Sequence, residues 1–382
     1  MPITDLTPFR QMVRAYSALL NINDTISKLP VQHRDAMRDA MGTSMRGTEK
    51  ELAGIRDALA VPSPRIENVV AALQERVETL ERSFDQRVAE ALREHIYLPT
   101  TSHWSVDKPF LPFSTCSAAD FIHPRYAELC AALSHPVQFH RKLWEWVFVL
   151  HHLDQLGVLK EGSRGVGFGI GTERLPSVFA NRGATVVATD APPEIGVSSG
   201  WTATGQHSDS LAELFYPQLI AKEAFAERVS HRFCDMNAID PSLTGFDFTW
   251  SCCCFEHLGS LEAGIQFVIN SVEQTLKPGG VAVHTTEFNL SSNDDTIESG
   301  PTVLYRRCDM ESLVQRLRDL GHDAQPFVIA PDSHFLDFHV DLPPYSNQPH
   351  LKLKLGNYVT TSVGVVIRKR LSRDVPYEGE TL

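Results

Sequence analysis

Short β-rich runs alternate with helical stretches in the second half of the chain, and this alternation limits the fold more than any other feature. The β-rich runs are Arg164–Gly169, Ala184–Thr189, Val229–Cys234, Phe246–Cys253, Gly280–Thr286, Ala324–Ile329 and Tyr358–Ile367. Strands that alternate with helices form a mainly parallel sheet with helices on both faces. The sequence therefore predicts a doubly wound α/β domain over residues 161–382.

The residues before this domain follow a different pattern. Residues 1–98 are predicted to be helical, and within 66–92 the apolar residues step alternately by four and three positions: Ile66, Val70, Leu73, Val77, Leu80 and Phe84. This spacing predicts a coiled-coil-like segment that joins copies of the chain into a homo-oligomer, although an amphipathic helix packed within one chain fits the same pattern. Residues 99–160 are expected to form a connection and a helical cap.

Length, charge and cysteine content exclude several classes of protein. The chain has 382 residues, more than one compact core usually holds, and a formal net charge of −12 at pH 7. An acidic surface repels phosphate backbones, which argues against a nucleic-acid partner. No apolar run approaches the about 20 residues that a membrane-spanning helix needs, and the start lacks a secretory leader pattern. Seven cysteines, three of them adjacent, favour a reducing compartment, so we expect a cytoplasmic protein.

A glycine-rich loop follows the first predicted strand. Its glycines stand at alternate positions: Gly167, Gly169 and Gly171. Glycines at a strand-to-helix turn let a ligand approach the backbone, where free N–H groups can bind it. The dinucleotide pattern GxGxxG would need glycine at position 172 or 174, where Thr172 and Arg174 stand. The spacing therefore disfavours a nicotinamide-dependent dehydrogenase.

Three further features follow the loop in order. The second strand ends in Asp190, about 20 residues past the loop, where a carboxylate can bind both hydroxyls of a ribose. The third strand runs into Asp235-Met236, where a polar group can meet an adenine, and Leu276-Lys-Pro-Gly-Gly precedes the fifth strand. With this ordered set, residues 160–370 resemble the class I S-adenosylmethionine-dependent methyltransferases.

The resemblance implies a seven-stranded sheet of order 3-2-1-4-5-7-6 with its last strand antiparallel, and S-adenosylmethionine as cofactor. The implied cofactor contacts are Gly167, Phe168, Gly169, Gly171, Glu173, Asp190, Asp235 and Met236. The family often has an acidic residue two positions before the first loop glycine, where this chain has Gly165. We expect Glu173, Glu256 or a residue further upstream to take its place.

Candidate catalytic residues follow strands four and five. His257 is the first choice for a general base, because an imidazole titrates near neutral pH and this one follows the cofactor-binding strand. In the alternative interpretation, Glu256 and His257 cap the next helix and contact the cofactor. Glu287, at the end of the fifth strand, is the second choice, and its alternative role is a hydrogen bond to neighbouring backbone.

The acceptor is expected to bind at the same edge of the sheet. The predicted acceptor contacts are Asn289, Arg306, His339 and Tyr345, with Trp104 and Trp201 available for stacking. For Arg306 and Arg307, surface pairs with Asp309 or Glu311 are the alternative. Three stretches, 285–289, 300–307 and 349–356, look similar to methyltransferases of bacterial sugar and polysaccharide biosynthesis, which implies O-methylation of a sugar, a glycan or a related polar metabolite. A methyltransferase acting on another small molecule or on a protein, and a catalytically degenerate scaffold suggested by Gly165, are the alternatives.

No metal site is predicted. Asp337, His339 and Asp341 alternate, so in an extended segment they would share one side and suit a hard cation, but a solvated loop explains them as well. Cys252-Cys253-Cys254 end a strand, and adjacent strand residues point to opposite faces, so they cannot bind one metal together. We expect them to be small core residues.

Overall fold

The structure is a computed structural model that describes residues 109–192, 211–346 and 348–371. The chain divides into two compact units, Met1–His103 and Trp104–Leu382, and all described residues belong to the second. The predicted helical region 1–98, its segment 66–92, Trp104 and Trp201 lie outside the described residues. Among the described helices, none is long and apolar enough to cross a membrane.

The described residues form helices and strands in alternation. The helices are α4 (Ala118–Ile122), α5 (Pro124–Ala132), α6 (Arg141–Gln155), α7 (Leu175–Asn181), α9 (Lys222–Arg228), α10 (Leu261–Asn270) and α11 (Arg307–Asp319). The strands are β1 (Arg164–Phe168), β2 (Thr185–Asp190), β3 (Val229–Phe233), β4 (Phe246–Cys252), β5 (Gly259–Ser260), β6 (Leu276–Asn289), β7 (Ser299–Gly300), β8 (Asp323–Ala324), β9 (Leu353–Leu355) and β10 (Tyr358–Arg368). Single turns of 3₁₀ helix are η3 (Leu211–Leu214), η4 (Phe255–His257) and η6 (Phe335–Phe338), and η5 (Ser271–Thr275) is a turn of π-helix.

One large sheet organises this unit. Its strands lie in the order β3-β2-β1-β4-β6-β10-β8, with β9 paired to β10, while β5 and β7 form a separate two-stranded sheet. In this sheet, β3, β2, β1, β4 and β6 run parallel to one another. Strand β10 is antiparallel to its neighbours β6, β8 and β9. When the seven strands of the main path are numbered along the chain, the order reads 3-2-1-4-5-7-6. The carboxyl ends of β1, β2, β4 and β6 therefore meet at one edge.

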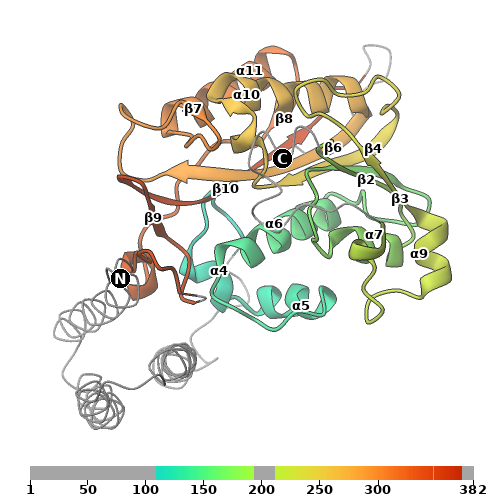
Figure 1. Cartoon of the computed structure of the whole chain (residues 1–382), viewed down its shortest axis with the longest axis horizontal. Coiled ribbons are helices and arrows are strands. Elements are labelled where there is room, and N and C mark those ends of the chain that lie inside the picture. The colour runs from blue at the N-terminus through green and yellow to red at the C-terminus, as the bar shows by residue number, and fades with distance from the viewer. Residues whose placement is uncertain (1–108, 193–210, 347, 372–382) are drawn as a thin grey trace, which may run out of the picture. The chain divides into compact units, whose positions relative to one another are not determined.

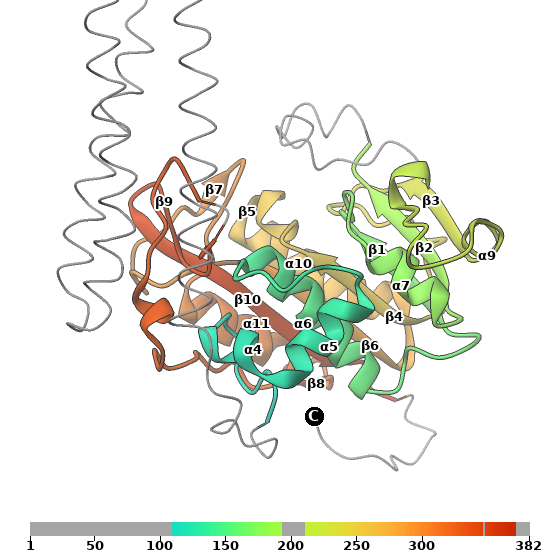
Figure 2. The same ribbon diagram turned by 90° about the horizontal axis from the view of Figure 1, so that it is seen from below.

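Helices cover both faces of the sheet. In Figures 1 and 2, α10 and α11 lie on one face, while α4 to α7 lie on the other. Alternate β10 residues Val363, Val365 and Ile367 join the hydrophobic core beneath α10 and α11. Gly364 faces α6, and a Cβ atom there would lie 2.2 Å from the ring of Phe148. The missing side chain lets α6 pack directly on β10.

The helix α6 carries more than the predicted apolar face. Its buried residues include Leu143, Val147 and Leu150, and also the charged residues Arg141 and Glu145. The helix contacts β4, β6 and β10, so this part of the predicted connection 99–160 packs on the same sheet as the rest of the unit. Charged side chains in its first turn thereby come to lie against the sheet.

The predicted strand Ala324–Ile329 is wrong for most of its length, because only Asp323–Ala324 pairs as a strand. The backbone N–H of Gln325 still donates to the carbonyl of Val366, but Pro326 has no N–H with which to continue the ladder. The fifth strand of the sheet, β6, is longer than predicted, because it begins at Leu276 rather than at Gly280.

Candidate functional site

The glycine-rich loop after β1 requires glycine for two separate reasons. Gly169 and Gly171 have φ angles of 56° and 49°, a left-handed conformation that side chains rarely adopt. A Cβ atom on Gly167 would lie 2.3 Å from the indole of Trp250, so no side chain fits there. The backbone of the loop can therefore pack closely over the ends of β1 and β4.

Asp190 fixes this loop to the end of β2. The side chain is buried, its Oδ2 accepts a hydrogen bond from the Gly171 N–H at 3.2 Å, and its Oδ1 accepts one from the Ala191 N–H at 2.7 Å. Each carboxylate oxygen thus bonds a backbone N–H group, which ties the loop to the end of β2.

The other predicted cofactor residues lie around the same strand ends with different partners. Phe168 places its ring in the core, 5.3 Å from the ring of Phe267, so only its backbone faces the loop. Met236 is buried next to Gly169, and Asp235 accepts a hydrogen bond from the Asn237 N–H at 2.8 Å. The predicted cofactor contacts themselves stay predictions.

Gly165 and Glu173 have packing partners of their own. A Cβ atom on Gly165 would lie 2.2 Å from the ring of Phe248, so an acidic residue has no space at this position. Glu173 is buried, and its Oε1 accepts a hydrogen bond from the Trp250 Nε1 at 2.6 Å. Burial raises the pKa of Glu173 to about 8, so this carboxyl group carries a proton at neutral pH.

A buried group of charged residues lies where the first turn of α6 meets the ends of β4 and β6. We call it the Arg141 cluster, and its members are Arg141, Lys142, Glu145, Cys253, Glu256 and Glu287. Three carboxylates face two cations there. No motif in the sequence predicts a role for Arg141, Lys142 or Glu145, and the only signal is their position near the start of a helix with an apolar face.

Arg141 is the centre of this cluster. Its guanidinium lies 2.7 Å from an oxygen of Glu287, 3.4 Å from one of Glu145 and 3.6 Å from the Cys253 sulfur, and it donates to the Ser362 hydroxyl at 3.1 Å. The Ser362 hydroxyl in turn donates to Glu145. Within the described residues, the Oε2 atom of Glu145 has no hydrogen-bond partner and lies 3.6 Å from the Lys142 Nζ.

The two predicted glutamates of the site have different partners. Glu287 pairs with Arg141 and accepts a hydrogen bond from the Thr360 hydroxyl at 2.5 Å. Its partners are thus side chains, and the alternative role in backbone hydrogen bonding is wrong. Glu256 is buried and accepts a hydrogen bond from the Thr286 hydroxyl at 2.8 Å. Of these two, Glu256 has no arginine partner in the described residues.

Three of these residues offer metal ligands. One ligand atom each of Cys253, Glu256 and Glu287 lies within 4.8 Å of the others. The guanidinium of Arg141 already supplies positive charge to Glu287 and Cys253, and a divalent ion there would be repelled by it. The three adjacent cysteines have different surroundings: Cys253 and Cys254 are buried, while Cys252 is partly exposed. All seven cysteines have free thiols.

His257 lies in η4 and is oriented by the β7 region. Its Nδ1 lies 2.8 Å from the carbonyl oxygen of Pro301 and 3.2 Å from the Thr302 hydroxyl. A carbonyl oxygen can only accept, so the Nδ1 atom of His257 donates this hydrogen bond.

A second group of polar residues lies between η6 and the start of α6. His350 bonds Asp341 at 2.6 Å, stacks on His140 with ring centroids 4.6 Å apart, and lies 5.5 Å from the ring of Tyr345. Burial, followed by the nearby His350, lowers the pKa of His140 to about 3. His339 lies in the same group, and burial lowers its pKa as well. The structure thus brings together two of the four predicted acceptor contacts, His339 and Tyr345.

The other two predicted acceptor contacts are used within the protein. Arg306 pairs with Asp309 at 2.9 Å and with Glu298 at 3.0 Å, so its alternative assignment as an ion pair is confirmed. Asn289 donates to the Asp295 carbonyl and accepts from the Ser291 N–H, which shapes the loop after β6. Both side chains therefore organise structure at the strand ends.

The possible cation site on alternating residues of 337–341 is wrong. The turn η6 interrupts the extended segment, and Asp337 faces α4, where its Oδ1 accepts from the Ala118 N–H at 2.8 Å. Asp341 instead pairs with His350. The two carboxylates therefore serve different parts of the fold.

Known proteins give little further guidance. No protein-family model and no curated protein matches the chain. Among solved structures, Haemonchus contortus phosphoethanolamine N-methyltransferase 2 in complex with S-adenosyl-L-methionine is 19% identical over 46% of this chain and 37% of its own, with a TM-score of 0.31. A putative sarcosine dimethylglycine methyltransferase from Galdieria sulphuraria is 13% identical over 64% of this chain and 98% of its own, with a TM-score of 0.35. A TehB-like SAM-dependent methyltransferase from Corynebacterium glutamicum is 14% identical over 64% and 93% of the two chains, with a TM-score of 0.33. TM-scores this low do not assign a fold, so the fold assignment depends on the strand order and the loop geometry of this chain.

Proposed function

We propose that this protein is an S-adenosylmethionine-dependent methyltransferase that methylates a hydroxyl group of a small polar acceptor, with sugars and glycans as the first class to test. The observation that carries the proposal is the contact between Asp190, at the end of β2, and Gly171, in the glycine-rich loop after β1. A carboxylate beside backbone N–H groups at the carboxyl edge of a doubly wound sheet suits a nucleoside ligand. The proposal includes a cytoplasmic protein that self-associates through residues 66–92.

The donor would bind over the glycine-rich loop. Asp190 is the carboxylate that would accept from the ribose hydroxyls, and the glycines at 167 and 169 let the loop backbone pack closely over the strand ends. When bound, S-adenosylmethionine supplies an electrophilic methyl group on a sulfonium. The residues of this chain then have to orient the acceptor in line with that methyl group and remove its proton.

The contacts in the site indicate different roles for the predicted catalytic residues. Glu287 is held by Arg141, so we assign it to positioning of the first turn of α6 rather than to proton transfer. His257, whose Nδ1 hydrogen is directed to Pro301, is the first candidate for the general base. Glu256, which lacks an arginine partner in the described residues, is the second candidate for the base.

The scaffold alternative loses its main argument in this fold. It depended on Gly165 in place of an acidic residue, and the ring of Phe248 explains that glycine by packing. A missing acid at this position therefore does not indicate a degenerate site.

The donor can be tested by isothermal titration calorimetry with S-adenosylhomocysteine and with NAD. We expect S-adenosylhomocysteine to bind and NAD not to bind, and Asp190→Ala to weaken binding by about tenfold or more, as the loss of a charge-assisted hydrogen bond does. Asp319→Ala, at an exposed position on α11, is the matched control. Binding of NAD alone, or equal binding by Asp190→Ala and the wild type, would contradict the proposal.

The acceptor class needs a separate measurement. Formation of S-adenosylhomocysteine should be followed with panels of sugars and glycans, other small polar metabolites, and proteins. Turnover only with proteins or non-sugar metabolites would replace the acceptor in the proposal and leave the donor unaffected.

A further inference from the structure

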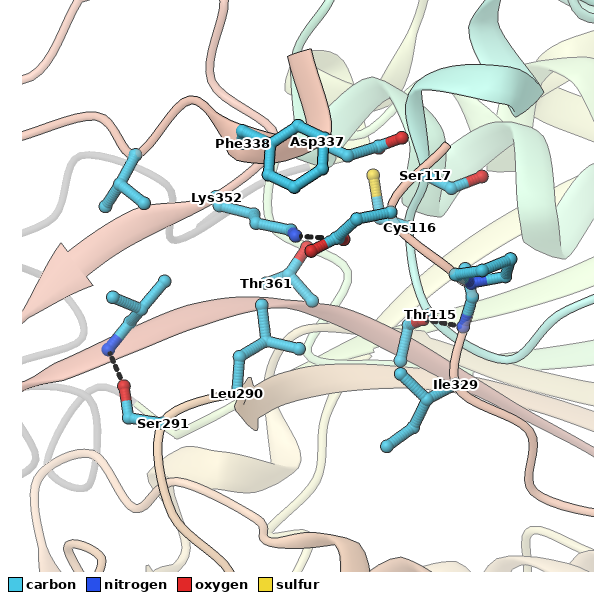
Figure 3. Close-up of a pocket in the computed structure, with 15 residues that line it drawn as sticks. Thr115, Cys116, Ser117, Leu290, Ser291, Ile329, Asp337, Phe338, Lys352 and Thr361 are labelled. Atoms are coloured by element: carbon cyan, nitrogen blue, oxygen red, sulfur yellow. Dashed lines mark hydrogen bonds and ion pairs between the residues drawn. The ribbon is translucent and has the colours of Figure 1, made fainter. Parts of the chain in front are cut away.

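A cavity of about 470 Å³ lies beside β10, and we call it the Lys352 cavity. Figure 3 shows the side chain of Lys352 reaching into a space between Phe338, Cys116 and Thr361. The remaining lining comes from residues within 115–117, 290–291 and 329–332, and from Asp337, Val340 and Val359. The cavity thus gathers residues that are far apart in the sequence.

The Lys352 cavity and the Arg141 cluster lie on opposite faces of β10. Thr360 and Ser362 bond Glu287 and Glu145 of the cluster, while Thr361 between them lines the cavity. Adjacent residues of a strand point to opposite faces, so the sheet itself separates the two sites. A ligand in the cavity would not compete with one in the Arg141 cluster.

The wall of the cavity is largely apolar and partly open. Leu290, Val340 and Val359 line it, and Ile329 and Phe338 leave 37% and 69% of their surface exposed at its rim. Exposed apolar side chains around a cavity are typical of sites that bind a ligand. The body of such a ligand would be apolar.

Lys352, the cation of the cavity, pairs with an acid that a ligand can replace. The Lys352 side chain is only 11% exposed, and its Nζ lies 2.6 Å from Asp332, whose side chain is 46% exposed. The other acid in the lining, Asp337, is held by the backbone N–H groups of Ala118, Ser333 and His334. A ligand anion can therefore displace the exposed Asp332 from Lys352 without disturbing Asp337.

Two hydroxyl groups add hydrogen-bond donors. The Thr115 oxygen accepts from the Ala330 N–H at 2.9 Å, and the Ser291 oxygen accepts from the Val359 N–H at 2.6 Å. Because each oxygen accepts a backbone hydrogen, each hydroxyl hydrogen is directed elsewhere and can be donated to a ligand. The ammonium of Lys352 suits an anionic head group, and the two hydroxyls add polar groups elsewhere in the lining.

We propose that the Lys352 cavity binds a small molecule with an apolar body and one carboxylate group, which takes the place of Asp332 on Lys352. The proposal does not depend on methyl transfer, because none of its residues belongs to the Arg141 cluster or to the glycine-rich loop.

The probe is decanoate, compared by isothermal titration calorimetry on the full chain with decan-1-ol and decyltrimethylammonium, which share its apolar chain. We expect decanoate to bind about tenfold more tightly than decan-1-ol, and the cationic probe to bind most weakly, because the carboxylate gains a charge-assisted hydrogen bond to the largely buried Lys352 while the displaced Asp332 is exposed and is solvated by water. Equal binding of decanoate and decan-1-ol would overturn the proposal.

Two variants test the anchor in opposite directions. Lys352→Met should weaken decanoate by about tenfold or more and leave decan-1-ol unchanged, while Lys354→Met, two residues further on at an exposed position of β9, should change neither. Asp332→Asn should tighten decanoate, because it removes the competing anion. A folding defect cannot produce this gain, and unchanged or weaker binding by a folded Asp332→Asn variant would overturn the proposed exchange of Asp332 for the ligand carboxylate.

Discussion

Glu173 shows what burial does to a single carboxyl group at the proposed cofactor loop. It lies beneath the loop against Trp250, and burial raises its pKa from 4.5 to about 8. Between these values the folded protein keeps a proton that the unfolded chain has released. Stability therefore falls as the pH rises through this range, and below pH 4.5 both states hold the proton.

Glu173→Gln should remove this pH dependence. Glutamine mimics the protonated carboxyl and keeps an oxygen that can accept from Trp250. We expect urea unfolding to give similar stabilities for the two proteins near pH 5, and the variant to be more stable near pH 8. The difference isolates Glu173 from other titrating groups, and parallel pH profiles would show that its pKa is not raised.

The glycines of the site could be predicted as a pattern, but their individual reasons could not. Positive φ explains Gly169 and Gly171, while contact with Trp250 and Phe248 explains Gly167 and Gly165. The second reason depends on side chains more than 80 residues further along the chain. No local pattern in the sequence identifies that contact.

At the scale of elements, the predicted strands were most accurate where the pattern was continuous. β3 and β10 begin at the predicted residues. The sixth strand is much shorter than predicted, because Pro326 cannot donate the next hydrogen bond between the strands. The role of α6 in the site was missed, since an apolar helical face predicts packing but does not reveal which strand ends its charged first turn will meet. Those charges become part of the site only when α6 packs on β6 and β10.

Arg141→Met tests this contact between elements. It leaves Glu287 and Glu145 buried without their arginine partner, and breaking a buried ion pair on one side typically costs about 3–5 kcal/mol. We expect a loss of that order in the free energy of unfolding, measured with urea, and partial recovery when Glu287→Gln is added.

The control for this prediction is Arg307→Met, which breaks the exposed pair with Glu311. Water and salt screen such an exposed pair, so this variant should unfold almost as the wild type does. Equal effects of Arg141→Met and Arg307→Met would show that the cluster does not hold α6 on the sheet.

At the scale of the whole molecule, the chain divides at His103–Trp104, and the second unit contains the sheet, both helical layers and the Arg141 cluster. The coiled-coil-like segment 66–92 remains a prediction about how copies of the chain assemble. A chain of residues 104–382 should unfold cooperatively and keep its affinity for S-adenosylhomocysteine, but light scattering should show fewer subunits than the full chain has. If both chains have the same number of subunits, the coiled-coil prediction is wrong.

The division of side chains along β10 limits how this protein can change over evolution. Thr360 and Ser362 serve one site and Thr361 serves another, so a single inserted or deleted residue near the start of the strand would exchange the two sets. Substitutions can alter either site alone, whereas a change in the length of the strand alters both at once. Loop-length variation among homologues should therefore stop before Tyr358, where β10 begins, and variation within the strand should take the form of exchanges between residues of similar size.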